Sequence, residues 1–292
     1  MSFSDEDVAH LRIPLKDIAS ATNNFAEENL LKRGEKADVY KGLLLQSEVE
    51  IDVVIRKYRC STLTFDFYAE INRISHVTHS NPVSLIGFCD EEDEQMLVME
   101  HVVNGSLDKY LSDPTLKWSQ KLLICRDAAN CLDSCREYNY IKCFSPKSFK
   151  ILLNKNMRAR VLFYIDSSSD PKNAFGMILL EVLYGRKATI EDVNQFQAKM
   201  AKNRYEKEEL SIFSGIDYTS FNTESLYIFS QVASDCLKGG LDFDSKELDR
   251  AHAIQWKHEN PVSIFSVSID IQPTFSLRRL SFCSIIVFLL CF

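Results

Sequence analysis

The spacing of apolar positions changes near residue 104 and divides most of the chain into two regions. In the first region, short apolar runs predict strands at residues 39–40, 53–55, 83–88 and 96–99. One stretch between them, residues 67–77, repeats apolar side chains at helical spacing and ends near Asn81-Pro82. A strand-rich segment that contains a single helix indicates a small α+β lobe over residues 29–103.

Residues 104–260 carry mainly helical spacing. The pattern predicts helices at residues 107–111, 118–136, 175–184, 193–209 and 221–237. The short apolar runs at 151–153 and 160–165 favour a hairpin. The segment 193–209 is mostly polar, so we expect it to lie exposed on a mainly α lobe.

The two ends of the chain differ from the regions between them. Residues 1–28 are polar and are expected to form an extension, in which Thr22 or Asn23 of the run 18–25 caps a short helix. Residues 261–292 form a tail rich in Ser, Ile and Phe that we expect to be poorly ordered, and its apolar end is too short to span a bilayer. The tail is interpreted either as a membrane-interface segment or as a read-through or mis-spliced coding segment.

Composition narrows the function classes. The 292 residues are 46% hydrophobic and 26% charged, which is typical of a folded globular protein. The net charge of −7 argues against nucleic acid as a partner. The nine cysteines include no C-x-x-C pair, and no leader pattern or spanning segment is present, so we expect reduced thiols in the cytoplasm. The nine glycines are few for this length, which disfavours a glycine-rich phosphate loop.

Short phrases of sequence recur in a recognisable order. They are TNNF at residues 22–25, VYKG at 39–42, VSLIGFC at 83–89, NGSL at 104–107, ILL at 151–153 and FGMILLEVLYGR at 175–186. Over about residues 11–260 the chain resembles plant receptor-like protein kinases. The resemblance implies an α+β, bilobal protein kinase-like fold with a β-rich N-lobe at 29–103, a mainly α C-lobe at 104–260 and a nucleotide site between them.

The resemblance places a glycine-rich loop at residues 32–39, where Gly34 remains and the other loop glycines are replaced. Arg56 occupies the position of the phosphate-binding lysine, unless Lys57 replaces it through a shifted register. Glu70 matches the glutamate that holds this lysine, so we expect an Arg56–Glu70 pair. Arginine does not replace lysine freely, because its guanidinium is larger and planar.

The positions that the family places around adenine keep their apolar type. They are Leu31, Val39, Val54, Met99 and Leu152. They predict either a nucleotide-sized slot or the apolar burial that a contact between lobes requires. No cofactor is expected, and ATP binding without Mg²⁺ stays open.

The residues that would carry catalysis are replaced. Ser145 stands at the position of the base, and Lys150 and Phe163 stand at the positions of metal ligands. Serine has no proton affinity suited to a base at neutral pH, a lysine places positive charge where a metal ligand is needed, and an aromatic ring supplies no carboxylate. Lys147 matches a lysine that contacts the transferred phosphoryl group, but without base and metal we interpret it as a solvated loop lysine. The sequence therefore predicts no catalytic residue and no metal site.

The substrate platform of the family is also shortened. Residues 166–174 stand where the family has a much longer activation segment, and we interpret Asp166 and Asp170 there as turn residues. His76 and His79 lack further ligands at metal-binding spacing, so they are expected to pack at the helix end.

We interpret the chain as a catalytically inactive pseudokinase that acts as a signalling scaffold or decoy by binding another kinase or a receptor. It would be cytoplasmic, or peripheral at the plasma membrane through its partner. One alternative is an active serine/threonine kinase with a rearranged site that uses Lys57, Lys147 and Asp166. Another is a decayed gene product without a stable fold.

Overall fold

The structure, a computed structural model, describes residues 8–59, 67–75, 81–137, 147–162, 171–202, 221–239 and 245–260. The chain forms two units, Met1–Asn260 and Pro261–Phe292, and the described residues belong to the first. Most strands lie before residue 104 and most helices after it, so this unit has the α+β architecture that the two spacing patterns predict.

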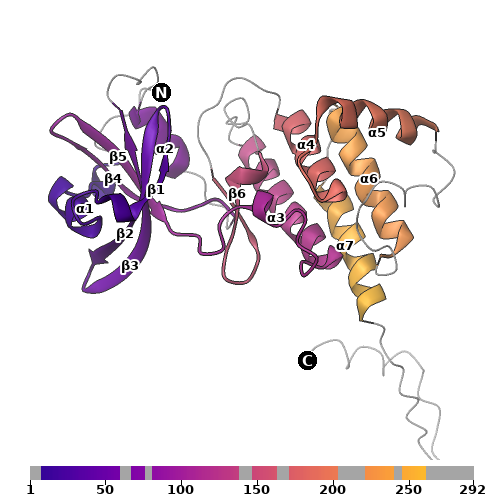
Figure 1. Cartoon of the computed structure of the whole chain (residues 1–292), viewed down its shortest axis with the longest axis horizontal. Helices are drawn as coiled ribbons and strands as arrows, with labels where there is room; N and C mark the ends of the chain where they lie inside the picture. The colour runs from indigo at the N-terminus through magenta and orange to yellow at the C-terminus, as the bar shows by residue number, and fades with distance from the viewer. Residues whose placement is uncertain are drawn as a thin grey trace, which may run out of the picture. The chain divides into compact units, whose positions relative to one another are not determined.

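Five strands form one antiparallel sheet within the described residues (Figure 1). They are β1 (Leu30–Arg33), β2 (Ala37–Gln46), β3 (Val49–Tyr58), β4 (Leu85–Glu91) and β5 (Glu94–Glu100), in the order β1-β2-β3-β5-β4. β2 and β3 pair from Ala37 opposite Tyr58 to Gln46 opposite Val49. Both strands extend beyond the apolar runs because their hairpin also pairs exposed residues.

A helix packs on each face of this sheet (Figure 1). α1 (Leu15–Ala21) buries Ile18 in a cluster with Ile55 of β3. α2 (Phe67–Ser75) buries Ile71 in a separate cluster. Successive side chains of a strand point to opposite faces, so β2, β3, β4 and β5 each contribute to both clusters.

Part of the N-terminal segment packs on the N-lobe sheet, because Ile18 of α1 is fully buried in the cluster that contains Ile55. The expected short helix capped by Thr22 is confirmed, and Thr22 is its C-cap. α1 ends at Ala21, and the hydroxyl of Thr22 donates to the Ile18 carbonyl at 2.9 Å. A threonine hydroxyl bonds either the first N–H groups or the last carbonyls of a helix, and here it bonds a carbonyl of the last turn. The three residues that follow have positive φ angles of 51, 54 and 56°, so the chain leaves the helix there.

The described part of the C-lobe contains five helices and one hairpin. They are α3 (Trp118–Glu137), α4 (Pro171–Tyr184), α5 (Ile190–Lys202), α6 (Thr223–Leu237), α7 (Ser245–Glu259), β6 (Ile151–Leu153) and β7 (Ala159–Val161). Single 3-10 turns lie along the chain at Ala9–Leu11, Glu27–Asn29, Leu107–Lys109 and Ser148–Lys150. The expected hairpin is confirmed, because β6 pairs with β7 antiparallel.

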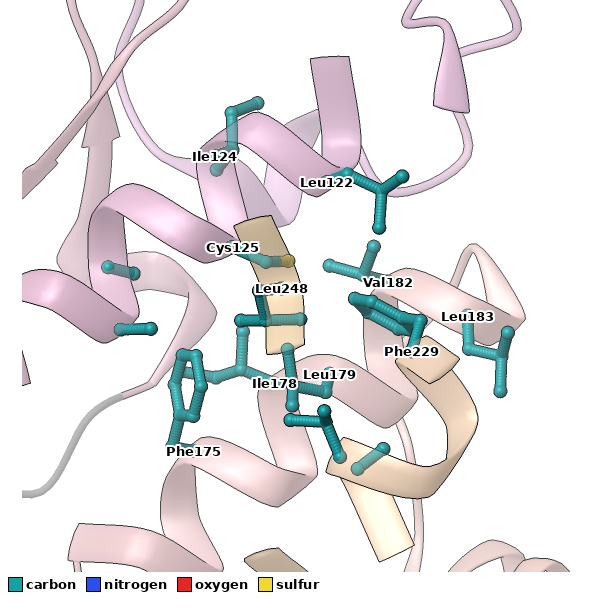
Figure 2. Close-up of a cluster of buried hydrophobic side chains, with 14 of the residues drawn as sticks. Leu122, Ile124, Cys125, Phe175, Ile178, Leu179, Val182, Leu183, Phe229 and Leu248 are labelled. Atoms are coloured by element: carbon teal, nitrogen blue, oxygen red, sulfur yellow. The ribbon is translucent and has the colours of Figure 1, made fainter. Parts of the chain in front are cut away.

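The core of the C-lobe lies between four helices (Figure 2). Cys125 of α3, Leu179 of α4, Phe229 of α6 and Leu248 of α7 all belong to one cluster of buried side chains. Burial of this apolar area is the main favourable term that holds these helices together.

Two C-lobe helices differ from the sequence-based expectation. α7 was not expected as a separate helix, because its few buried positions include a polar residue, Gln255, which weakens its apolar stripe. The helix expected at 193–209 begins earlier, and it is not simply exposed, since Phe196 and Met200 are buried.

Candidate functional site

The β6–β7 hairpin joins the two lobes by backbone hydrogen bonds on both of its sides. The amide of Val83 donates to the carbonyl of Val161 in β7 at 2.9 Å. The amide of Asn104 donates to the carbonyl of Leu153 in β6 at 3.0 Å. The hairpin is therefore held between the segment that precedes β4 and the segment that follows β5.

A salt bridge adds to this junction. Arg160 of β7 donates through Nε to the Oε1 atom of Glu100, the last residue of β5, at 2.7 Å. A second guanidinium nitrogen donates to the hydroxyl of Ser84 at 3.1 Å. Both acceptors belong to the N-lobe, so a single arginine of the C-lobe ties the end of β5 and the start of β4 together.

The apolar slot positions lie partly in one cluster at the junction. Met99 is buried there and Leu152 packs against the same cluster. Val54 lies opposite Met99 across the β3–β5 pair, and Val39 lies opposite Arg56 across the β2–β3 pair. Leu31, by contrast, is exposed. Of the five predicted slot positions, Met99 and Leu152 thus share this cluster, whereas Leu31 lies outside it.

Gly34 lies in the short turn between β1 and β2. A Cβ atom at this position would lie 2.5 Å from the carbonyl oxygen of Ala37, so no side chain fits without a backbone shift. The turn is tight because Arg33 already pairs with Asp38. Gly34 is thus needed for the geometry of the turn, which is sufficient reason for a glycine here.

Arg56 and Glu70 are brought together through Tyr58. The Tyr58 hydroxyl donates to Oε2 of the buried Glu70 at 2.9 Å. The guanidinium of Arg56 lies 5.0 Å from the centre of the Tyr58 ring. Burial raises the pKa of the Tyr58 phenol, and the nearby Glu70 carboxylate raises it further, so the phenol stays a hydrogen-bond donor. The structure thus gives the helix glutamate a tyrosine partner that the sequence did not suggest.

Lys57 points to the other face of the sheet. Its ammonium pairs with Oε1 of Glu94 on β5 at 2.7 Å and lies 4.4 Å from the centre of the Phe25 ring. Since adjacent strand residues alternate between faces, Lys57 and Arg56 cannot both face α2. The alternative in which Lys57 replaces the phosphate-binding lysine through a shifted register is therefore wrong for this structure.

Lys150, which the family resemblance aligns with a metal ligand, is buried. It is 1% exposed. The backbone fixes it tightly: its amide donates to the Lys147 carbonyl, and its carbonyl accepts from the Leu162 amide, both at 2.8 Å. Lys147 itself is exposed, as expected for a solvated loop lysine.

Several residues discussed in the sequence lie outside the described residues. They are Ser145, Phe163, Asp166, Asp170, His76 and His79. Within the described part of the chain, no group of three or more His, Cys, Asp or Glu side chains could hold a metal ion.

Three lysine side chains surround the ring of Phe149, a cluster that was not predicted from the sequence. The ammonium groups of Lys32, Lys147 and Lys187 lie 5.8, 5.9 and 5.9 Å from the centre of its ring. Lys187 also donates to the buried Ser148 hydroxyl. The sequence does show Phe149 close to Lys147 in one loop. It does not show that Lys32 and Lys187 approach the same ring, because they come from distant segments.

The fold and this junction define a protein kinase-like domain, and comparison with known proteins agrees. A sequence model of the family described as protein tyrosine and serine/threonine kinase matches residues 25–143. An L-type lectin-domain containing receptor kinase of Oryza sativa subsp. japonica is 30% identical over 220 residues, which covers 63% of this chain and 33% of that protein. A probable receptor-like protein kinase of Arabidopsis thaliana is 32% identical over 272 residues, which covers 78% of this chain and 32% of that protein.

These similarities identify the chain as a member of the plant receptor-like kinase family. The chain spans about a third of the length of the curated relatives it matches. Among the helices of the described residues, none is long and apolar enough to cross a membrane.

Proposed function

We propose that this kinase-like domain transfers no phosphoryl group and acts by binding another kinase or a receptor. The observation that carries the proposal is the burial of Lys150, which is 1% exposed. A protonated lysine offers no lone pair and repels a divalent cation, whereas magnesium needs oxygen ligands. The residues present therefore do not fit Mg²⁺ at this position.

The N-lobe contacts support the same conclusion. In this family of reactions, catalysis is almost entirely positioning and electrostatic stabilisation of the phosphoryl group. Glu70 accepts a hydrogen bond from Tyr58, and Lys57 pairs with Glu94 on the opposite face. The lysine–glutamate pair of an active site is thus not formed by Lys57, and the arginine at position 56 is a poor substitute.

The first test is thermal unfolding of the full chain alone, with ATP, and with ATP plus Mg²⁺. A ligand that binds only the folded state raises its stability, by about 2.7 kcal/mol at a hundred times its Kd. We expect a cooperative transition whose midpoint temperature with ATP is not raised by the addition of Mg²⁺. A magnesium-dependent rise would contradict the proposal, and loss of any cooperative transition would support the decayed-product alternative instead.

A phosphotransfer assay tests the same point directly. We expect no transfer of labelled phosphate to the chain or to an added acceptor protein. If transfer is seen, Lys147→Met and the remote control Lys41→Met separate an activity of this chain from a contaminant. Activity that Lys147→Met abolishes and Lys41→Met preserves would overturn the proposal.

Partner binding is tested by sedimentation velocity with a purified, active kinase domain of an L-type lectin-domain containing receptor kinase. We expect a complex that forms equally with and without ATP, because the binding does not use catalysis. Through such a partner the domain would lie at the cytoplasmic face of the plasma membrane. Failure to bind any receptor-like kinase domain in a panel would contradict the scaffold role while leaving the loss of catalysis standing.

A further inference from the structure

The C-lobe contains a cavity that shares no residue with the lobe junction. Its volume is about 720 Å³, and its wall combines the loop before α3, the first turn of α3, the end of α4 and the end of α7. We call it the Lys121 cavity, after the one deeply buried cation that lines it. A volume of this size suits a small organic molecule.

Much of the wall is apolar and aromatic. Leu111, Leu116 and Trp118 line the cavity and are almost completely buried. Phe221 also lines it and packs edge-on against Trp118, with ring centres 5.2 Å apart. These side chains offer a rigid surface for a flat, apolar body, because aromatic rings supply large contact area with few rotatable bonds.

The polar feature of the wall is an unneutralised buried charge. Lys121 is 4% exposed, and its ammonium donates to the Leu111 carbonyl at 2.9 Å. Within the described part of the chain this is its one hydrogen bond, and it forms no ion pair. Burial lowers the pKa of Lys121, and the Asp113 carboxylate opposes this shift only in part. Buried charges in proteins are normally paired, so a missing counter-charge points to a ligand.

The carboxylates that line the cavity are bound to other donors. Asp113 accepts from the amide and the hydroxyl of Thr115 at 2.8 and 2.7 Å. Glu259 accepts from the Ser119 hydroxyl at 2.6 Å and from the Gln255 amide at 2.9 Å. The Asp113 charge acts on Lys121 without an ion pair, and within the described residues neither carboxylate forms a salt bridge with its ammonium.

We propose that the Lys121 cavity binds a small organic acid with an apolar, ring-sized body. The carboxylate of the ligand pairs with the Lys121 ammonium, and the body lies against Trp118 and Phe221. The exposed Lys117, which also lines the cavity, adds a second positive charge to its wall. The site is independent of nucleotide binding and of the proposed scaffold role.

The experiment is a ¹⁹F NMR titration of the full chain with 4-(trifluoromethyl)benzoate and with its neutral isostere 4-(trifluoromethyl)benzamide. We expect saturable binding of the acid and at least about tenfold weaker binding of the amide, because the amide cannot neutralise the buried cation. Equal affinities, or no saturable binding of the acid below about 10 mM, would overturn the proposal.

Variants then locate the site. Lys121→Met keeps the length of the side chain but removes its charge, so it should abolish the preference for the acid. Lys41→Met, on an exposed strand position of the N-lobe, should leave both affinities unchanged. Retention of the full acid preference in Lys121→Met would show that the acid binds elsewhere.

A second readout does not depend on the folding of Lys121→Met. The chain has two tryptophans, so Trp256→Phe leaves Trp118 as the sole tryptophan reporter. In this background, with Lys121 intact, the acid should change the Trp118 fluorescence with the same midpoint as the NMR titration. Acid binding by NMR without any change at Trp118 would place the acid outside the cavity.

Discussion

The ion pair between Arg158 and Asp127 gives a sharp prediction about stability. Asp127 on α3 is 2% exposed, and it accepts from Arg158 through both oxygens, from Nε at 2.6 Å and from Nη2 at 2.7 Å. Arg158 lies in the turn of the β6–β7 hairpin. The pair therefore ties the hairpin at the lobe junction to the C-lobe core.

The magnitude follows from burial. A hydrogen bond to a charged group contributes about 1.5–3 kcal/mol, and removing one partner of a buried pair leaves the other charge uncompensated. The Arg158 side chain is 42% exposed, and Arg126 stays 3.4 Å from Asp127, so solvent and the second arginine reduce the loss. We expect Arg158→Met to lower the free energy of unfolding by about 2–3 kcal/mol, which lowers Tm by roughly 5–10 °C.

Arg186 serves as a control, because it also donates two hydrogen bonds to one carboxylate, from Nη1 and Nη2 to Asp192 at 2.8 and 2.7 Å. The Arg186 side chain is 56% exposed, and Asp192 keeps hydrogen bonds from Thr189. Arg186→Met should therefore lower Tm far less than Arg158→Met, because water replaces the lost guanidinium. The assay is thermal and urea unfolding of the full chain at pH 7, followed by circular dichroism. Equal losses in the two variants would refute the argument that burial sets the magnitude.

Three further predictions concern the turn, the N-terminal helix and pH. Glu48→Gly should stabilise the chain by about 0.5–1 kcal/mol, because Glu48 has a φ of 66° in the β2–β3 turn, which glycine adopts without strain. The control Glu50→Gly, within β3, should destabilise the chain. The urea midpoints of unfolding measure both effects, and an unchanged midpoint for Glu48→Gly would contradict the backbone strain at this residue. Ile18→Ala should cost about 2–4 kcal/mol in the same assay if residues 8–28 belong to the lobe, and a negligible loss would show that they do not. Burial and nearby arginines lower the pKa of His252, so its neutral form is favoured in the folded state, and the stability that it contributes is lost as the pH falls below about 6.5. His252→Gln should reduce the loss of stability between about pH 7 and 5, while the exposed control His258→Gln should leave it; an unchanged profile in both would count against this assignment.

The sequence predicted the parts of this fold that depend on local pattern. The strand runs, the helix at 67–77 and the β6–β7 hairpin follow from periodicity over a few residues, and the structure confirms them with shifted ends. The helix α7 was not predicted from the sequence, because one of its few buried positions, Gln255, is polar. Thr22 caps a short helix as expected, but only the structure shows that it caps the C-terminal end, because a threonine hydroxyl suits either end of a helix.

The residues of the candidate site also differ in how much the sequence reveals about them. The family phrases place Lys150 at a metal-ligand position from the sequence alone, and its charge already argues against magnesium there. That the side chain is buried, that Glu70 bonds Tyr58 and that Lys57 pairs with Glu94 became visible only in the structure. The sequence gives the type of each residue, but the partner of its side chain depends on which distant segments pack against it.

The sequence by itself thus determined the element types of the two regions, and its resemblance to the family predicts that the catalytic side chains are replaced. The tertiary structure alone decided which charges are paired and which are not. Lys121 shows the physical reason. Its position in α3 does not indicate its electrostatic environment. That environment depends on Asp113 in the preceding loop and on Glu259 in α7, and both carboxylates accept hydrogen bonds from other donors. Burial and pairing are properties of the packed chain, because they depend on which groups exclude water from one another.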